Sequence, residues 1–332
     1  VLTCYFSAPK SGSRIGLRTE PEIKPEADWV QIDDRTRVAE RGRHTAWIAR
    51  PRPANVLTAY GEVVRGGTAK VEVAVHQPQL VFGNLLAERI ARFSGEERGD
   101  AARIGVRLAS EGESLEGGVT VARVQSLLRD ALRRANTNSQ NLYTEAMIKR
   151  VGHEVTGTPG SWTNGAAVIR LLLAEKLGAD HAAAVSIGDG SGLSRENLIP
   201  PETMTAWLAM VFREDEETRD AFIDSMPVPG TGTLRDRFAG SRVENDIRAK
   251  SGTINGVRCL SGYVVSRADP SRAVAFSVLI NDITGGRQVR AAKRLHEQVA
   301  LAVDGWVTET DRERGVVPAG NSEPSQPAAL GG

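Results

Sequence analysis

Two short segments of the sequence combine side chains that could handle a peptide substrate. Ser139 and Asn141 stand two residues apart in NTNSQNLYTE. In a tight turn, this spacing places a hydroxyl that can relay a proton beside a carboxamide that can hold a substrate carbonyl or N–H. The second segment, KSGT at 250–253, offers an ammonium, two hydroxyls and a glycine, and the missing Cβ of Gly252 would let a substrate backbone approach. Together they would suit a peptide whose terminal carboxylate needs a cation and hydroxyl donors.

Each of these patterns also has a purely structural explanation. Serine and asparagine two residues apart are common at turns, and a lysine–serine–glycine run is common at strand starts. The stretch DGSGLSREN at 189–197 is a rival for the first pattern, but its serine–asparagine spacing is one residue too long. Because Gly- and Ser-rich turns usually shape the fold, we expect it to be a structural loop. Cys259 alternates with apolar residues, so we expect an unreactive thiol.

Ser7 and Lys10 have the S-x-x-K spacing of a serine that forms an acyl-enzyme. Such a pair needs a helix, because one helical turn brings the lysine beside the hydroxyl that it activates. The residues after Lys10 carry no apolar stripe, and Gly12 and Gly16 oppose a helix. We therefore expect TCYFSAPKSG to be a loop at the entry of a β-rich module, and we expect Ser7 not to be the nucleophile.

The elements that must position these residues follow from hydrophobic periodicity. Apolar residues from Val124 to Leu132 fall at helical spacing, and a second helix is expected directly after them at about 140–151. Further helices are expected at 164–177, 200–212 and 289–303, and strands at 104–108, 257–265 and 272–280. This order of helices and strands predicts an α+β fold, without the alternation of a doubly wound sheet.

Composition divides the chain into three parts. Residues 1–77 hold β-branched runs separated by turns, which predicts a β-rich module. Residues 78–306 contain the expected helices and the hairpin of the candidate site. Residues 307–332 are polar and rich in Pro, Gly, Ser and Glu, which predicts a disordered tail.

Composition also limits the kinds of partner. The chain has 332 residues with 40% hydrophobic and 25% charged residues, which is ordinary for a globular protein with room for two domains. The net charge of +1 gives no reason to expect nucleic acid or an anionic membrane surface, and no apolar run is long enough to cross a bilayer. The histidines lack metal-ligand spacing and the two cysteines make no disulfide framework, so we expect no metal and no cofactor.

Four segments, taken in order, resemble a known family. S-x-N at a helix–helix junction, followed by K-[ST]-G at the start of an antiparallel strand, is the order of the penicillin-recognising serine enzymes. The chain resembles the D-alanyl-D-alanine carboxypeptidase/endopeptidase family, the low-molecular-mass class C penicillin-binding proteins, from residue 1 to about 305. The matching segments cover about 130–266 and read ANTNSQNLYTEAMIKRVG, GTPGSWTNGAAVIRLLL, IGDGSGLSRENLIPPETM and RAKSGTINGVRCLSGYVV.

The resemblance implies a penicillin-binding, β-lactamase-like serine transpeptidase fold of the α+β class, with 1–77 as the all-β module that these enzymes insert into the catalytic domain. Ser139 would pass a proton to or from the leaving amine. Asn141 would orient the substrate amide. Lys250 would set the local electrostatic potential and help to bind the substrate carboxylate.

The resemblance also implies roles for the residues that follow Lys250. Ser251 stands where the family usually has threonine, and its hydroxyl is retained. Gly252 and Thr253 would line the strand edge, with the Thr253 N–H as one oxyanion-hole donor.

The implied function is a serine-type D-Ala-D-Ala carboxypeptidase/endopeptidase that acts on peptidoglycan stem peptides through an acyl-enzyme. β-Lactam antibiotics would bind the same site, and the protein would work in the periplasm or elsewhere outside the cytoplasm. The S-x-x-K nucleophile would then lie upstream of Val1, so we expect an N-terminally truncated chain with a partial catalytic domain; the chain shows no secretory signal. Two alternatives stay open: a catalytically silent fold that only binds peptide, and a β-lactamase-like serine hydrolase, against which the inserted module argues.

Overall fold

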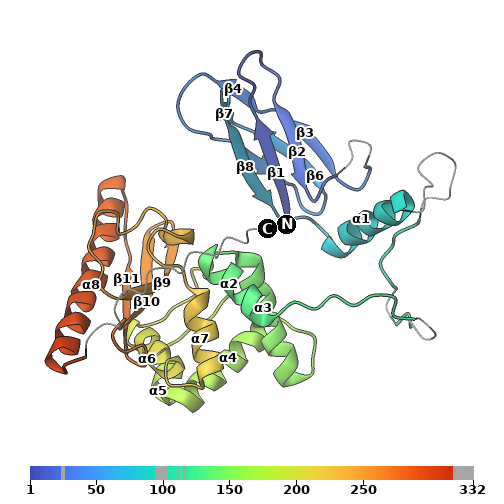
Figure 1. Ribbon diagram of the computed structural model, residues 1–332. Helices are drawn as coiled ribbons and strands as arrows, with labels where there is room; N and C mark the ends of the chain where they lie inside the picture. The colour runs from blue at the N-terminus through green and yellow to red at the C-terminus, as the bar shows by residue number, and fades with distance from the viewer. Residues whose placement is uncertain (24–26, 94–103, 111, 115–116, 118, 317–332) are drawn as a thin grey trace, which may run out of the picture. The chain divides into compact units, whose positions relative to one another are not determined.

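The computed structural model describes the chain except for residues 24–26, 94–103, 111, 115–116, 118 and 317–332 (Figure 1). The chain forms two compact units, Val1–Val121 and Ala122–Gly332. The boundary between the units falls at Val121, and the predicted domain limit at residue 77 stays a prediction. No helix in the described ranges is both long and apolar enough to cross a membrane.

The first unit consists mainly of short strands, as the β-branched runs in its sequence predict. Its sheets have the strand orders β2-β1-β8, β3-β6-β5 and β4-β7. β1 is antiparallel to both of its neighbours, whereas β3 and β6 run parallel. The elements are β1 (Leu2–Ser7), β2 (Gly16–Glu20), β3 (Gln31–Asp34), β4 (Arg37–Ala39), β5 (Trp47–Ala49), β6 (Val56–Tyr60), β7 (Glu62–Val64), β8 (Thr68–Val73) and helix α1 (Pro78–Phe93).

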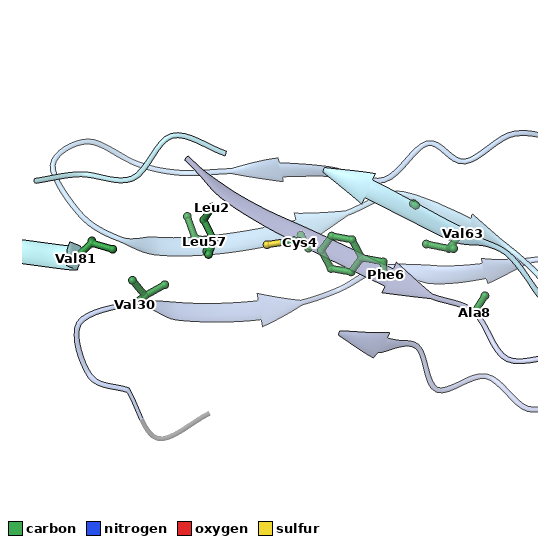
Figure 2. Close-up of a cluster of buried hydrophobic side chains, with 10 residues drawn as sticks. Leu2, Cys4, Phe6, Ala8, Val30, Leu57, Val63 and Val81 are labelled. Carbon is green, nitrogen blue, oxygen red and sulfur yellow. The ribbon is translucent and has the colours of Figure 1, made fainter. Parts of the chain in front are cut away.

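Strand β1 supplies much of the core of this unit. Its alternate residues Leu2, Cys4 and Phe6 are buried together with Leu57 and Val63 (Figure 2). The expectation that TCYFSAPKSG is an entry loop is therefore wrong for its first half. The alternation of apolar and polar residues from Leu2 to Ser7 has the period of a half-buried strand, and the neighbouring strands pair with both edges.

A second expectation in this unit is also wrong. Residues Ile104–Leu108 form no strand, and Ile104 and Leu108 are exposed. No described strand edge pairs with this segment. A short apolar run does not become a strand without such a partner.

The second unit contains the helices and the hairpin that periodicity predicts. The first helix of this unit begins later than expected, at Leu128, and Val124 and Leu127 lie outside it. The capping box of Ser161 and Asn164 starts the third helix of this unit at Trp162. The elements are α2 (Leu128–Thr137), α3 (Asn141–Thr156), α4 (Trp162–Leu177), α5 (Ala179–Ala183), α6 (Pro201–Val211), α7 (Glu216–Ser225), the 3₁₀ turn η1 (Gly232–Leu234), β9 (Asp246–Ile254), β10 (Val257–Val265), β11 (Ala273–Ile280) and α8 (Gly286–Glu313).

The antiparallel sheet of this unit has the order β11-β10-β9, which leaves β9 at an edge. Leu260 and Val264 on one face of β10 pack in a buried cluster with Ala300 of α8. On the other face, the Tyr263 hydroxyl donates to the backbone carbonyl of Leu208 in α6 at 2.7 Å. Helices therefore cover both faces of the sheet, and β9 is held firmly on its β10 side.

Helix α8 continues beyond its predicted end at residue 303, to Glu313. The carboxylate of Asp304 accepts hydrogen bonds from the backbone N–H of Asn245 at 2.8 Å, and Asp311 accepts one from the Ser266 hydroxyl at 2.6 Å. Both aspartates are buried, and so is Val307. The polar composition after residue 306 therefore misled the sequence interpretation, because Val307 and the Asp311 carboxylate are buried instead of facing water. The rest of the predicted tail, 317–332, lies outside the described residues.

Candidate active site

The turn between α2 and α3 carries the first predicted segment. Ser139 lies there with a φ of +55°, in the left-handed region that is unfavourable for a residue with a Cβ. The carbonyl of Arg134 accepts hydrogen bonds from the N–H groups of Asn138 and Gln140, at 3.3 and 3.4 Å. These contacts close the turn and leave Ser139 exposed. Asn141 follows as the first residue of α3 and is also exposed.

The second predicted segment, 250–253, lies on the edge strand β9. The backbone N–H of Ala249 points away from β10 and donates to the carbonyl of Pro227 at 3.2 Å. Along an antiparallel strand, successive N–H groups alternate between the two edges. The N–H groups of Ser251 and Thr253 therefore point to the same edge as that of Ala249. Among the described strands none pairs with this edge, which leaves it open to a ligand.

The fold brings the two segments into contact. The Lys250 ammonium donates to the Ser139 hydroxyl oxygen, with 3.0 Å between Nζ and Oγ, although 111 positions separate the two residues. It also donates to the backbone carbonyl of Ser251. Burial lowers the pKa of Lys250, and the nearby Cys259 thiol acts in the opposite direction. The site thus contains a partly dehydrated cation held against a serine hydroxyl.

Gly252 shares the face of β9 that carries Lys250. Its neighbour on β10 is Cys259, and a Cβ added to the glycine would lie 3.3 Å from the Cβ of that cysteine. A side chain here would crowd β10 and cover the strand next to the ammonium. Burial raises the pKa of the Cys259 thiol, in keeping with the expected unreactive cysteine.

The loop at 189–197 is a tightly hydrogen-bonded turn beside α3. The Asp189 carboxylate accepts hydrogen bonds from the N–H groups of Gly192 and Ser194, at 2.7 and 2.6 Å. Glu145 of α3 accepts from the N–H of Ser191 at 3.1 Å. This geometry agrees with a structural loop that is fixed to the helix that Asn141 begins.

Sequence reasoning missed two side chains that support the site. Glu145 lies one helical turn after Asn141, so its spacing was the signal that could have marked it. Arg195 donates to the backbone carbonyl of Asn255, in the turn between β9 and β10, at 2.8 Å. No spacing marks Arg195, because its partner is a backbone atom far along the chain. The two side chains link the loop to both elements of the site.

The Ser7–Lys10 pair has different surroundings. Strand β1 ends at Ser7, and the residues after it form a bend instead of a helix. The Ser7 hydroxyl lies 3.0 Å from the hydroxyl of Thr68 on β8. The absence of a helical turn supports the expectation that Ser7 is not activated by Lys10.

Comparison with known proteins places this geometry in a family context. Among curated proteins, a D-alanyl-D-alanine carboxypeptidase from Actinomadura sp. (strain R39) is 28% identical over 265 residues, which are 77% of this chain and 47% of that protein. Carboxypeptidase DacB from Mycolicibacterium smegmatis is 30% identical over 174 residues, 51% of this chain and 37% of that protein. The chain therefore spans about half, or less, of the length of these relatives.

Solved structures show the same fold. Penicillin binding protein 4 (dacB) from Haemophilus influenzae matches with a TM-score of 0.62 at 19% identity, over 90% of this chain and 65% of that one. Its complex with a novel β-lactam matches with a TM-score of 0.55, over 90% of this chain and 68% of that one. The predicted α+β, penicillin-binding fold is thereby confirmed.

The family model of the D-Ala-D-Ala carboxypeptidase 3 (S13) family matches residues 6–302. The match includes most of the β-rich unit, the Ser139 turn, strand β9 and most of α8. It confirms the resemblance deduced from the four sequence segments. The chain belongs to the D-Ala-D-Ala carboxypeptidase 3 (S13) family.

Proposed function

We propose that this chain supplies the proton-transfer and substrate-binding part of a serine-type D-Ala-D-Ala carboxypeptidase/endopeptidase. Its substrate would be a peptidoglycan stem peptide, cleaved through an acyl-enzyme, and β-lactams would bind the same site. The observation that carries the proposal is the 3.0 Å contact between Lys250 and Ser139. Because peptidoglycan lies outside the cytoplasmic membrane, we propose an extracytoplasmic location.

The direction of the Lys250–Ser139 hydrogen bond gives each group a role. An ammonium has only donors, so the Ser139 oxygen must accept, and the Ser139 hydroxyl proton is left to point elsewhere. In this arrangement Ser139 can donate its proton to the nitrogen of a departing D-alanine while taking one from Lys250. The lowered pKa of Lys250 favours this exchange, because the buried ammonium releases its proton more readily than an exposed one.

The open edge of β9 suits an extended peptide. A substrate strand could pair with the backbone groups of Ser251 and Thr253, in the manner of strand addition to a sheet edge. The Thr253 N–H would then face the carbonyl under attack. The Lys250 ammonium and the Ser251 hydroxyl would favour the terminal carboxylate, and Asn141 would orient the substrate amide.

The acylated serine is not Ser7 in this proposal. Ser7 is the one serine of the sequence with lysine three residues later, and it ends a strand. The predicted S-x-x-K nucleophile upstream of Val1 stays a prediction. Two alternatives remain. A fold that only binds peptide would leave its ligand unchanged, whereas a β-lactamase-like hydrolase would hydrolyse a bound β-lactam.

The test uses the full chain with two ligands. Binding of an N-acetylated peptide ending in D-Ala-D-Ala is measured by NMR titration, with the L-Ala-L-Ala peptide as control, and labelling by a fluorescent penicillin is followed on a denaturing gel. We expect selective binding of the D-peptide. Binding without labelling supports a peptide-binding role for this chain alone, and rapid turnover of penicillin supports the β-lactamase alternative. Covalent labelling that disappears in Ser7→Ala overturns the rejection of Ser7. Absence of both binding and labelling overturns the proposed function.

A further inference from the structure

A short segment at the end of α7 lies against both halves of the candidate site. We call residues 224–227 the brace. Ser225, Met226 and Pro227 are almost completely buried, with exposed fractions of 1% for Ser225 and 5% for Met226. A buried segment of this kind contributes packing, but the contacts of its polar groups indicate a more specific role.

The brace holds the turn that carries Ser139. The Asn136 amide donates to the Ser225 hydroxyl oxygen at 2.7 Å, and the Thr137 hydroxyl donates to the Ser225 carbonyl at 2.8 Å. Asn136 and Thr137 are the last two residues of α2, immediately before the turn. A Cβ on Gly232 would lie 2.3 Å from the Thr137 carbonyl oxygen, so the chain beyond the brace also packs directly against this point.

The same segment holds the strand that carries Lys250. The Pro227 carbonyl accepts from the N–H of Ala249, the residue before Lys250, at 3.2 Å. The Asp224 carboxylate pairs with the Arg248 guanidinium at 2.9 Å. Both contacts lie within two residues of Lys250, and the first of them is on the open edge of β9.

We propose that the brace is a positioning segment that sets the distance between the Ser139 hydroxyl and the Lys250 ammonium. Ser139 is held in an unfavourable backbone conformation, and its partner lies on a different element. Four contacts from the brace hold both the turn that carries Ser139 and the strand that carries Lys250. The catalytic meaning of this spacing rests on the proposed function, but the spacing itself does not.

The decisive variant is Thr137→Val in the full chain. Valine has nearly the shape of threonine but cannot donate to the Ser225 carbonyl, so the Ser139 turn loses one of its two attachments to the brace. We expect the turn to move away from β9, so that water reaches Lys250. The pKa of Lys250 should then rise toward its ordinary value, because its burial is relieved. The Lys250 titration is followed by NMR, with the signal assigned from Lys250→Met. Peptide affinity should fall about fivefold, the equivalent of one ordinary hydrogen bond.

Two matched variants separate positioning from general stability. Thr137→Ser keeps the hydroxyl and should restore the wild-type titration. Thr310→Val removes a similar threonine bond, to the Trp306 carbonyl on α8, and should leave the Lys250 titration unchanged. A Thr137→Val protein that melts a few degrees lower, yet titrates at Lys250 like the wild type, overturns the proposal.

An exposed variant covers the case in which Thr137→Val does not fold. Asp224→Asn breaks the ion pair with Arg248, and 58% of the Asp224 side chain is exposed. Loss of a nearby negative charge would by itself lower the pKa of Lys250, whereas loosening of the brace raises it. A rise therefore supports the proposal, and an unchanged or lowered pKa overturns it. If the wild type binds no D-Ala-D-Ala peptide, the proposed function fails, while the titrations still decide the role of the brace.

Discussion

The molecule contains two serine–lysine pairs that are related in opposite ways. Ser7 and Lys10 are three residues apart in sequence, but Ser7 ends a strand and bonds to Thr68. Ser139 and Lys250 are 111 positions apart and their side-chain atoms lie 3.0 Å from each other. The first pair has the sequence spacing of a catalytic motif but lacks the helix that this motif needs. The second pair is in contact, although no short spacing in the sequence relates its two residues.

The difference shows what a sequence motif requires. On a helix, residues three apart share a face, whereas on a strand they point to opposite faces. Short spacing is therefore meaningful only together with the element that it occupies. The distant pair depends instead on the packing of α2, α7 and β9, which fixes both residues from outside the motif.

The largest expected effect is that of removing the Lys250 charge. Lys250→Met should weaken binding of the D-Ala-D-Ala peptide by about 10- to 100-fold, because a hydrogen bond from a charged donor contributes about 1.5–3 kcal/mol. Lys10→Met is the matched control and should bind like the wild type. Both affinities are measured by NMR titration at neutral pH. An equal loss of peptide affinity in Lys250→Met and Lys10→Met would contradict the different roles given to the two serine–lysine pairs.

The pH dependence should sharpen the same contrast. Burial lowers the pKa of Lys250, so its ammonium is lost at a lower pH than the ordinary 10.5. Peptide affinity should fall as the pH rises through that lowered value. Stability should change with the opposite sign: the folded chain releases the proton before the unfolded chain does, so the free energy of unfolding rises over the same range. Calorimetry and peptide titration from pH 7 to 10.5 check both trends, and Lys250→Met should abolish them while Lys10→Met retains them.

Removing the Ser139 hydroxyl should have a moderate effect. Ser139→Ala should weaken peptide binding about fivefold, as expected for the loss of one hydrogen bond of about 1 kcal/mol. Ser139→Gly should bind equally weakly but be more stable than Ser139→Ala by about 1 kcal/mol, because glycine tolerates the positive φ. Thermal unfolding of the two variants makes the comparison. Equal stabilities would contradict the strained turn.

The smallest expected effect is that of Ser7→Ala. The Ser7–Thr68 hydrogen bond is exposed, so its loss should change the free energy of unfolding by no more than about 0.5 kcal/mol and leave peptide binding unchanged. Urea unfolding and NMR titration measure the two quantities. A loss of binding in this variant would return Ser7 to the site.

The sequence predicted those parts of the fold that depend on local pattern. The helices α3, α4 and α6 and the β10–β11 hairpin follow from periodicity and end signals. Strand β1 was missed because its alternation is short and the residues that follow Lys10 show no regular pattern. The end of α8 was missed because the polar residues around Asp311 resemble a solvated tail, and only the tertiary structure supplies the partner that buries this carboxylate.

The candidate site was predictable to the same extent. The motif order predicted Ser139, Asn141 and Lys250 as site residues, and the structure brings Ser139 and Lys250 into contact. The brace could not be predicted, because two of its four contacts join side chains that no short sequence spacing relates, and the other two use the backbone carbonyls of Ser225 and Pro227. Every residue has a carbonyl, so no residue type marks such contacts in a sequence.

The open edge of β9 has a consequence for the solution behaviour of the protein. An unpaired edge strand is a template for pairing with the edge of another copy, and long, flat, apolar edges lead to aggregation. Here the edge is short, because Pro227 occupies it at Ala249. It also carries the positive charge of Lys250, which a second copy would bring against its own. The cation that is proposed to bind the peptide would therefore also oppose pairing of this edge with a second copy.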